Sequence, residues 1–345
     1  MSTPLTRREF IRHAACGAAV VGLGLKSDAQ ESTRNLEHTL TVIAGKPRER
    51  GRTYGAKFKD AIHAFLEKEI YASFSAKPNT KEQMLRFAGA CGKAIKEYSP
   101  LLFDEMEGMA EGSGLSLDEI VLLTNHEELW HRGVIPAMDH CTVFGAAPPD
   151  TKDGETFVCQ TWDWMESVYG MSSMLLWKRP EGPSLLAYAY PGLWTGAGIN
   201  SAGIALCWHT GGGDGKEPRV GIPAYVLIAQ MLYQDTLKGA LEEARRATNA
   251  GWFVYLLGDG QGNHATVRGT PKKIEIVNDI KSNGGRIRAD GDSKVDLARL
   301  KENCGSVKVK STIDAMIYNC AKKEVHLTRR AGGVTPWKTF RFDEK

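Results

Sequence analysis

The sequence lacks several of the patterns that would assign a function directly. Its 345 residues contain no CxxC pair and no CxxH spacing, so no metal site is predicted, and no cofactor is expected. No long run of Lys or Arg occurs and the formal net charge is only +3, so nucleic acid is not an expected partner. No internal repeat or low-complexity tract is visible. The hydrophobic fraction of 42% and charged fraction of 25% are typical of a soluble globular protein.

A long apolar run is also missing. The mild apolar stretch from Ala14 to Leu25 is too short to span a bilayer as a stable helix, so no stable membrane anchor is expected. It follows Thr6-Arg7-Arg8-Glu9-Phe10-Ile11-Arg12 and precedes Ser27-Asp28-Ala29. This layout is typical of a Tat signal peptide, although an amphipathic N-terminal arm is the alternative. We predict that residues 1–29 direct export to the periplasm or the medium and are then removed.

Disulfides are not required by the cysteine pattern. Without Cys16, an even number of cysteines remains: Cys91, Cys141, Cys159, Cys207, Cys304 and Cys320. An even count in an exported protein suggests pairing, but a chain of this length can bury a core without disulfides. Tat substrates also fold in a reducing cytoplasm before export. We expect mostly free thiols, one of them catalytic.

The periodicity changes along the chain. Residues 55–130 are predicted to be helical, with strands at 156–163, 173–178, 185–190 and 203–208. Helices at 223–233 and 236–247, the latter capped by Asp235, precede strands at 252–257 and 264–267 joined by a turn at 259–262. This order suits an α+β protein with two stacked sheets covered by helices, although periodicity alone does not exclude other α+β layouts.

Three polar residues follow one another in an order that suits amide chemistry. Cys141 lies in Asp139-His140-Cys141-Thr142, Asp163 in Gln160-Thr161-Trp162-Asp163-Trp164, and Asn200 in Gly198-Ile199-Asn200-Ser201-Ala202-Gly203. If the chain were cut between His140 and Cys141, the new α-amino group, with a pKa of roughly 7.7–8.0, could act as base for the Cys141 thiol. Asp163 would orient that amine, and Asn200 would donate to the oxyanion.

Each of these residues also has a purely structural interpretation. Cys141 could be packed in a strand, since free cysteine is usually a small buried hydrophobic residue. Asp163 could form a turn after a strand, and Asn200 could adopt a left-handed turn without contacting substrate. The order of all three residues favours the catalytic interpretation.

The motifs resemble those of the isopenicillin N acyltransferase family, cysteine enzymes of the N-terminal-nucleophile hydrolase superfamily. The resemblance extends from Gly45 to about Ile276 and also covers Leu123-Thr124-Asn125-His126-Glu127-Glu128 and Leu257-Gly258-Asp259-Gly260-Gln261-Gly262. It implies a four-layer αββα sandwich, self-cleavage before Cys141, and amide hydrolysis or acyl transfer. Residues 30–140 and 141–345 would then be two fragments that stay associated in one folded domain, 30–345.

Several positions depart from the family pattern. His140 stands where the family usually has glycine, and Gln160 stands where the related bile-salt and penicillin V hydrolases have arginine. Arg268 replaces an expected glutamate, and the family's later Thr-Asn-His segment is not evident. We predict that Asn278 takes the role of the second oxyanion asparagine, with Asn283 as the other nearby candidate.

The predicted substrate is a small N-acyl amide or short peptide amide. Six of the eight tryptophans fall between residues 162 and 252, where they could line an apolar acyl pocket or fill the core. Gln160, Trp194 and His209 are predicted to contact the substrate. Hydrolysis is favoured over acyl transfer because acyl-coenzyme A is scarce outside the cytoplasm. The alternatives are an uncleaved, inactive binding protein of this fold and a papain-like protease using His209 or His264 as base.

Overall fold

Two β-sheets lie face to face in the computed structural model, which describes residues 38–72, 80–130, 141–164, 168–211, 218–330 and 336–343. The larger sheet has the strand order β1-β4-β5-β6-β7-β8-β9-β10, and the smaller has the order β13-β12-β11-β3-β2. Strands β2 and β3 pack against β7 and β8 of the other sheet. These residues belong to one compact unit, Leu36–Lys345.

The strands are antiparallel to their neighbours except for β1 and β4, which are parallel. The larger sheet contains β1 (Leu40–Ala44), β4 (Ser173–Lys178), β5 (Leu185–Tyr190), β6 (Leu193–Asn200), β7 (Ala205–Thr210), β8 (Phe253–Gly258), β9 (His264–Gly269) and β10 (Ile274–Val277). The smaller sheet contains β2 (Thr142–Ala146), β3 (Phe157–Asp163), β11 (Thr312–Asn319), β12 (Glu324–Arg329) and β13 (Lys338–Arg341).

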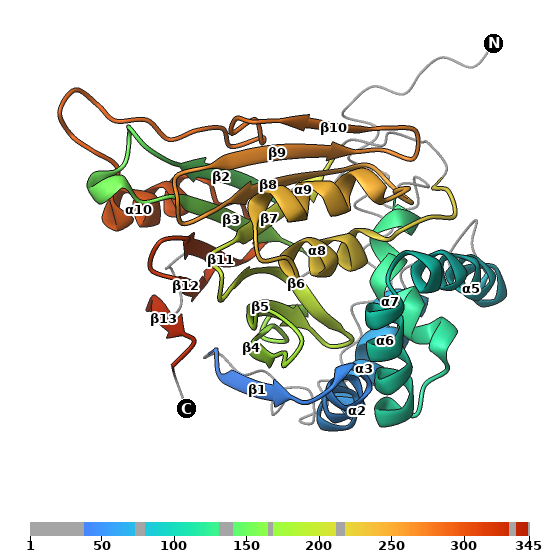
Figure 1. The fold of residues 1–345 in the computed structure, drawn as a ribbon. Coiled ribbons are helices and arrows are strands. Elements are labelled where there is room, and N and C mark those ends of the chain that lie inside the picture. The colour runs from blue at the N-terminus through green and yellow to red at the C-terminus, as the bar shows by residue number, and fades with distance from the viewer. Residues whose placement is uncertain are drawn as a thin grey trace, which may run out of the picture. The chain divides into compact units, whose positions relative to one another are not determined.

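Helices cover both outer faces of the paired sheets (Figure 1). Helices α8 (Ala224–Leu232) and α9 (Leu237–Arg246) pack on the larger sheet, and α10 (Leu297–Val307) packs on the smaller one. The layers are therefore helix, sheet, sheet and helix, so the predicted αββα sandwich is confirmed. Within the described ranges, the helices are all too short or too polar to cross a membrane.

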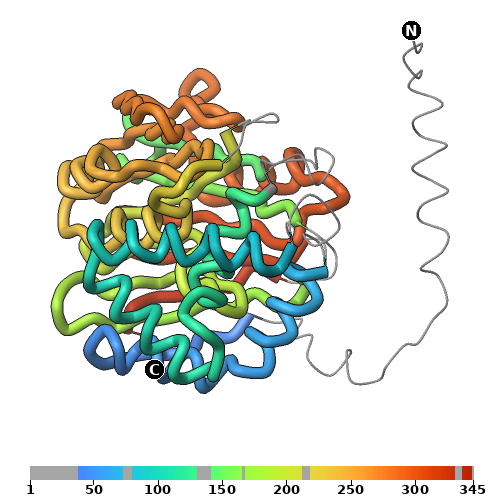
Figure 2. Tube along the Cα trace, turned by 90° about the vertical axis from the view of Figure 1, so that its right-hand side faces the viewer, coloured from blue at the N-terminus to red at the C-terminus, as the bar shows by residue number. Residues whose placement is uncertain are grey.

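A further group of helices lies beside the sandwich. It comprises α2 (Pro47–Lys57), α3 (Lys59–Phe65), the π-helix η1 (Leu66–Tyr71), α5 (Lys81–Tyr98), α6 (Pro100–Ser113) and α7 (Leu117–Trp130). Figure 2 shows these helices, blue to green, in front of the strands. The short 3-10 helix η2 (Lys152–Gly154) follows β2.

Helices α2 and α6 touch at the level of their backbones. A Cβ atom added at Gly51 of α2 would overlap the carbonyl oxygen of Glu105, and one added at Gly108 of α6 would overlap that of Arg48. Only glycine permits such an approach, so these residues fix the helix pair.

Several local signals in the sequence act as predicted. Ser99 caps α6 ahead of Pro100, and Gly114 ends that helix in the left-handed region at φ 75°. The cap of α9 is a correction, because Thr236, not Asp235, accepts a hydrogen bond from the Gly239 N–H at 3.0 Å.

Strands β6 and β7 separate along part of their length. They pair only at Gly198–Leu206 and Ile199–Ala205, so residues 193–197 of β6 have no register partner in β7. The indole N–H of Trp208 spans this opening to the carbonyl oxygen of Gly196 at 2.6 Å. The larger sheet is thus split at one end.

Two predictions concern residues outside the described ranges. These are the export signal at residues 1–29 and the residue before the predicted cut, His140. Both stay predictions.

Candidate active site

Cys141 directly precedes β2, the last strand of the smaller sheet. Thr142 pairs with Thr161 on β3, and this register sets Cys141 beside the end of β3. The Cys141 Sγ lies 3.8 Å from the carbonyl oxygen of Asp163, and the residue packs against the main hydrophobic core. The predicted nucleophile therefore lies beside the backbone of the residue that carries the predicted carboxylate.

The Asp163 carboxylate is held in place at the end of β3. Only 4% of the residue is exposed, and its Oδ1 accepts a hydrogen bond from the hydroxyl of Thr312 at 2.5 Å. Thr312 belongs to β11, the strand next to β3. The carboxylate is thus fixed from the neighbouring strand beside Cys141.

Asn283 holds the backbone at Cys141. Its Nδ2 donates to the Cys141 carbonyl oxygen at 2.7 Å, and its Oδ1 accepts the Val143 N–H at 2.8 Å. The next residue, Gly284, donates its N–H to the Val143 carbonyl oxygen at 2.8 Å. The segment around Asn283 therefore runs along the free side of β2 and fixes the peptide that carries the thiol.

Gln160 lies on β3 opposite Val143 and is fully buried. Its Oε1 accepts the backbone N–H of Trp208 at 3.2 Å, on the part of β7 that β6 leaves unpaired. Its amide is close enough to the Cys141 thiol to influence the pKa of that thiol. The predicted substrate contact is thus near the nucleophile.

The thiol is strongly protonated in the uncut chain. Burial raises the pKa of the Cys141 thiol to about 12, and the negative charges of Asp163 and Glu127 contribute to the rise. A thiolate is therefore disfavoured unless a positive charge or a base is supplied nearby.

Glu127 and His126 of α7 join the site from outside the sheets. The hydroxyl of Tyr225 donates to Glu127 Oε1 at 3.1 Å, and burial raises the pKa of Glu127 to about 8. Burial also lowers the pKa of His126 to about 4, so the imidazole is neutral near pH 7. Glu127 is thus an uncharged acid at neutral pH for part of the population.

Aromatic side chains close the split between β6 and β7. Successive ring centroids lie 5.3–6.3 Å apart in the cycle Trp162, Trp208, Tyr225, His126 and Trp164, which returns to Trp162. All five side chains are buried. Trp162, Trp164 and Trp208 therefore belong to the hydrophobic core near Cys141, one of the two positions predicted for the tryptophans.

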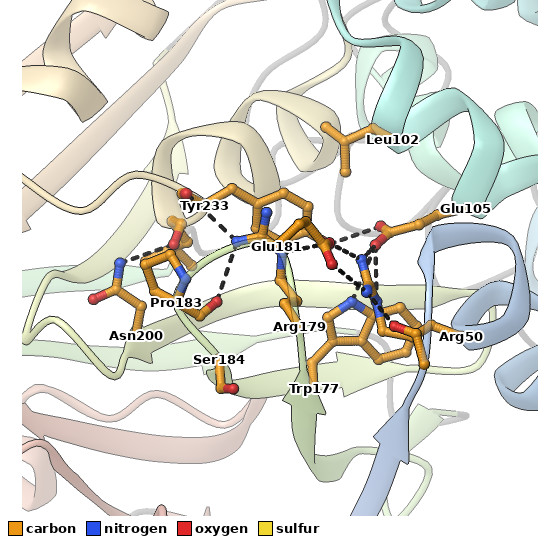
Figure 3. A network of polar contacts seen from close by, with 12 residues as sticks. Arg50, Leu102, Glu105, Trp177, Arg179, Glu181, Pro183, Ser184, Asn200 and Tyr233 are labelled. Atoms are coloured by element: carbon orange, nitrogen blue, oxygen red, sulfur yellow. Dashed lines mark hydrogen bonds and ion pairs between the residues drawn. The ribbon is translucent and has the colours of Figure 1, made fainter.

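Asn200 does not join this group. Its Nδ2 donates to the carbonyl oxygens of Leu232 and Gln234 at 2.9 and 2.8 Å, and its Oδ1 accepts the N–H groups of Ala202 and Ile204 at 3.1 and 3.0 Å. Figure 3 shows its side chain on the Tyr233 side of a separate polar network. The carboxamide is fully occupied with the turn after β6 and the end of α8, so the structure gives no support to its predicted oxyanion role.

Trp194 and Asn278 also lie away from the thiol. The indole N–H of Trp194 donates to the Tyr233 hydroxyl at 3.3 Å, and its ring lies 6.5 Å from that of Trp177. Asn278 lines a cavity of about 860 Å³ between α9 and the turn after β8. Of the two candidate asparagines, Asn283 is the one that contacts the Cys141 peptide, at its carbonyl oxygen.

The two histidines of the papain-like alternative are held by other groups. His209 Nδ1 lies 2.8 Å from the carbonyl oxygen of Thr210, and the ring is buried in β7. His264 lies 3.4 Å from Arg286 and 3.9 Å from Asp279. Within the described residues, no group of three His, Cys, Asp or Glu side chains is arranged to hold a metal ion.

Sequence reasoning gave no role to Glu127, Tyr190 or Tyr225. Glu127 lies in the motif Leu123–Glu128, whose polar residues are all buried. That motif could have indicated a role for Glu127 from the sequence. Tyr190 and Tyr225 are buried, and burial raises the pKa of each well above its ordinary value. Nothing in the local sequence marks either tyrosine.

The structure has an αββα sandwich with a thiol directly before a strand of an inner sheet. This is the architecture that the family resemblance predicts. A model of the family described as acyl-coenzyme A:6-aminopenicillanic acid acyl-transferase matches residues 150–288. That range includes Gln160, Asp163 and Asn283 but not Cys141. The predicted resemblance to the isopenicillin N acyltransferase family is therefore confirmed in this part of the chain.

A similar curated protein carries the name of that family. The 40 kDa form of acyl-coenzyme A:6-aminopenicillanic-acid-acyltransferase from Emericella nidulans is 24% identical over 200 residues, 58% of this chain and 54% of the relative. The chain thus spans about half the length of the curated relative it matches.

Two solved structures also match. Penicillin V acylase from Agrobacterium tumefaciens has 14% identity and a TM-score of 0.36, covering 59% of this chain and 85% of its own. A mutant form of conjugated bile acid hydrolase from Clostridium perfringens has 11% identity and a TM-score of 0.41, covering 60% of this chain and 93% of its own.

Proposed function

We propose that this chain is a self-processing cysteine amidohydrolase of the acyltransferase-related type, which cleaves a small N-acyl amide. The observation that carries the proposal is the position of the Cys141 thiol, 3.8 Å from the backbone of Asp163, with Asn283 clamping its peptide. An acidic side chain beside the future amino terminus suits an N-terminal nucleophile.

Self-cleavage would use the same thiol. The Cys141 Sγ attacks the carbonyl carbon of His140, the peptide nitrogen of Cys141 leaves with the thiol proton, and a thioester forms. Water then hydrolyses the thioester, so His140 ends in a carboxylate and Cys141 begins with a free amine. Because burial holds the pKa of the thiol near 12 in the uncut chain, this first cut is expected to be slow.

The new amine would change the electrostatics of the site. It accepts the thiol proton and becomes an ammonium group beside Asp163, and that positive charge opposes the burial that keeps the thiol protonated. The thiolate attacks the amide carbonyl, the ammonium returns its proton to the leaving nitrogen, and water hydrolyses the acyl thioester. Transfer of the acyl group to an amine instead of water is the acyltransferase form of the same cycle.

The apolar neighbours of the thiol indicate the substrate class. The five buried rings around the β6–β7 split suit an apolar acyl or aryl group next to the scissile amide. The proposed setting is extracytoplasmic, following the twin-arginine pattern, and there hydrolysis is favoured over transfer.

The two fragments are proposed to stay together after the cut. A polar network joins them: the buried Arg50 and Glu105 precede the cut, whereas the buried Tyr233 and the more exposed Glu181 follow it (Figure 3). The Arg50 guanidinium donates to both carboxylates, and the Tyr233 hydroxyl donates to Glu105 at 2.7 Å. Such buried pairs break only at a high free-energy cost.

A denaturing gel with intact-mass analysis tests the proposal. We expect two fragments that meet between His140 and Cys141 in the wild type, and a whole chain in Cys141→Ala. Cys141→Ser is a matched control, because a hydroxyl can still cut, more slowly. A wild-type chain that stays whole would instead favour the inactive binding protein.

A further inference from the structure

We propose that the Gln160 carboxamide donates a hydrogen bond to the oxyanion formed when Cys141 attacks, the role predicted from the sequence for Asn200. This inference rests on the proposed function and names a further catalytic residue for it. It follows from the register of β2 and β3, from the buried N–H group of Gln160, and from the occupation of the other carboxamides.

The sheet register brings Gln160 next to the thiol. Val143 is directly opposite Gln160, and Cys141 is two residues before Val143, so the side chains of Cys141 and Gln160 are diagonal neighbours on one face. Diagonal neighbours in an antiparallel pair lie within reach of a long side chain. A glutamine here therefore extends toward the reacting atoms.

The orientation of the Gln160 amide is fixed by β7. The Trp208 N–H donates to Oε1 at 3.2 Å, so the oxygen is committed and Nε2 is the end left for another partner. That Nε2 atom is buried and has no hydrogen-bond partner within the described part of the chain. A buried N–H without an acceptor is unfavourable, and an acceptor that arrives with the substrate would satisfy it.

The other carboxamides considered for this role are occupied. Asn200 spends both its donor and its acceptor atoms on backbone groups after β6. Asn283 donates to the carbonyl oxygen of Cys141 itself. Gln160 is thus the carboxamide beside the thiol that keeps a donor available.

The chemistry at the thiol points the same way. Burial and the Asp163 charge raise the pKa of the Cys141 thiol, whereas the nearby Gln160 amide lowers it. An N–H group that stabilises a negative sulfur also lies where the neighbouring negative oxygen of a tetrahedral intermediate forms. The donor would act most strongly there because the site excludes water.

Two substitutions separate donation from packing. Gln160→Glu keeps an acceptor for the Trp208 N–H but replaces the donor with an oxygen, and Gln160→Met keeps the length without either group. The matched control is Gln261→Glu, which makes the same change at an exposed turn residue. The readouts are intact mass, the unfolding midpoint, and kcat and KM for an N-acyl p-nitroanilide that the wild type hydrolyses.

We expect both Gln160 variants to lose about 10²–10³-fold in kcat with KM within about threefold, while Gln261→Glu is unchanged. A variant that stays uncut has no active nucleophile, so its kcat cannot be compared. If such a variant keeps its unfolding midpoint, a fall in the self-cleavage rate as large as the expected fall in kcat supports the same role, because the cut also passes through an oxyanion. Folded Gln160 variants that cut and turn over at wild-type rates would overturn this inference alone. A wild type that neither cuts nor turns over would overturn the proposed function and this inference with it.

Discussion

Cys141 depends on residues that are distant in the sequence. Asp163 lies 22 residues later, and Asn283 lies 142 residues later, yet both contact the Cys141 peptide or its thiol. Asn283 makes two hydrogen bonds to backbone groups, so its carboxamide holds the peptide that carries the predicted nucleophile.

Asn283→Ala is expected to slow self-cleavage by about tenfold or more, because the loss of two hydrogen bonds leaves the Cys141 peptide free to move by the small distances that matter for attack. The rate is measured by intact mass during expression or after refolding. Asn278→Ala is the matched control and should cut within about twofold of the wild type. Equal rates in the two variants would contradict the clamp.

The Asn200 side chain holds the turn after β6. Asn200→Ala removes four hydrogen bonds to buried or partly buried backbone groups, so we expect it to lower the free energy of unfolding by about 2–4 kcal/mol. Protein that still folds should cut and turn over with a nearly normal kcat. Chemical denaturation and single-turnover assays measure the two effects separately, and a stable but inactive variant would restore the catalytic interpretation.

At the scale of elements, α7 places two carboxyl groups in the interior. Burial raises the pKa of both Glu127 and Glu128 to about 8 from 4.5. The unfolded chain therefore loses these protons at lower pH than the folded chain. Their contribution to stability is fully present below pH about 4.5 and is lost as the pH rises through about 8.

Glu128→Gln should remove its share of that pH dependence. Glu128 Oε1 accepts the first N–H of α8 from Ala224 at 2.8 Å, and glutamine can keep this bond. We expect the fall in the free energy of unfolding between pH 5 and pH 8 to shrink by on the order of 3 kcal/mol. Denaturant titrations at several pH values measure it. Glu97→Gln, at an exposed position of α5, is the control that should follow the wild type.

The α2–α6 contact makes a second prediction at this scale. Gly51→Ala places a Cβ on top of a backbone oxygen, so the helices must separate, and we expect about 2–4 kcal/mol of destabilisation. Gly305→Ala in α10 meets no atom within 4 Å and should instead stabilise by up to about 1 kcal/mol. Thermal unfolding of the two variants checks the difference in sign.

Some elements could be predicted from the sequence and others could not. Strands β4 and β5 have the predicted bounds, because each is an apolar run between turn residues. Strand β6 was not among the predicted strands, since its Gly196 and Gly198 weaken the local strand signal. Cys141 and Asp163 could be predicted as partners, because their two motifs follow each other in the sequence and lie at neighbouring strands, β2 and β3. Asn283 could not be distinguished from Asn278, because only the path of the chain along β2 decides between them.

At the scale of the whole molecule, the two fragments that the proposed cut would produce share one folded unit. The helical group before Cys141 supplies Glu127 to the site and Arg50 and Glu105 to the buried network. The part of the chain after Cys141 supplies the remaining site residues and Glu181. Separation of the fragments would therefore take apart both the network and the site.

Self-cleaved protein is expected to run as a single species under native conditions and as two bands under denaturing ones. Glu105→Ala tests the network, because it removes the fully buried partner of Arg50 and the acceptor of the Tyr233 hydroxyl. We expect it to lower the free energy of unfolding by about 3 kcal/mol or more and to release the fragments in native mass spectrometry at a lower denaturant concentration. Glu111→Ala is the control: it removes a carboxylate paired with Arg48 and Arg52 on the surface of the same helices, where such pairs contribute little to stability. Fragments that separate in the wild type under native conditions would contradict the proposed association. Fragments that stay equally associated in both variants would show that contacts outside this network hold them, because Glu105 belongs to the network and Glu111 does not.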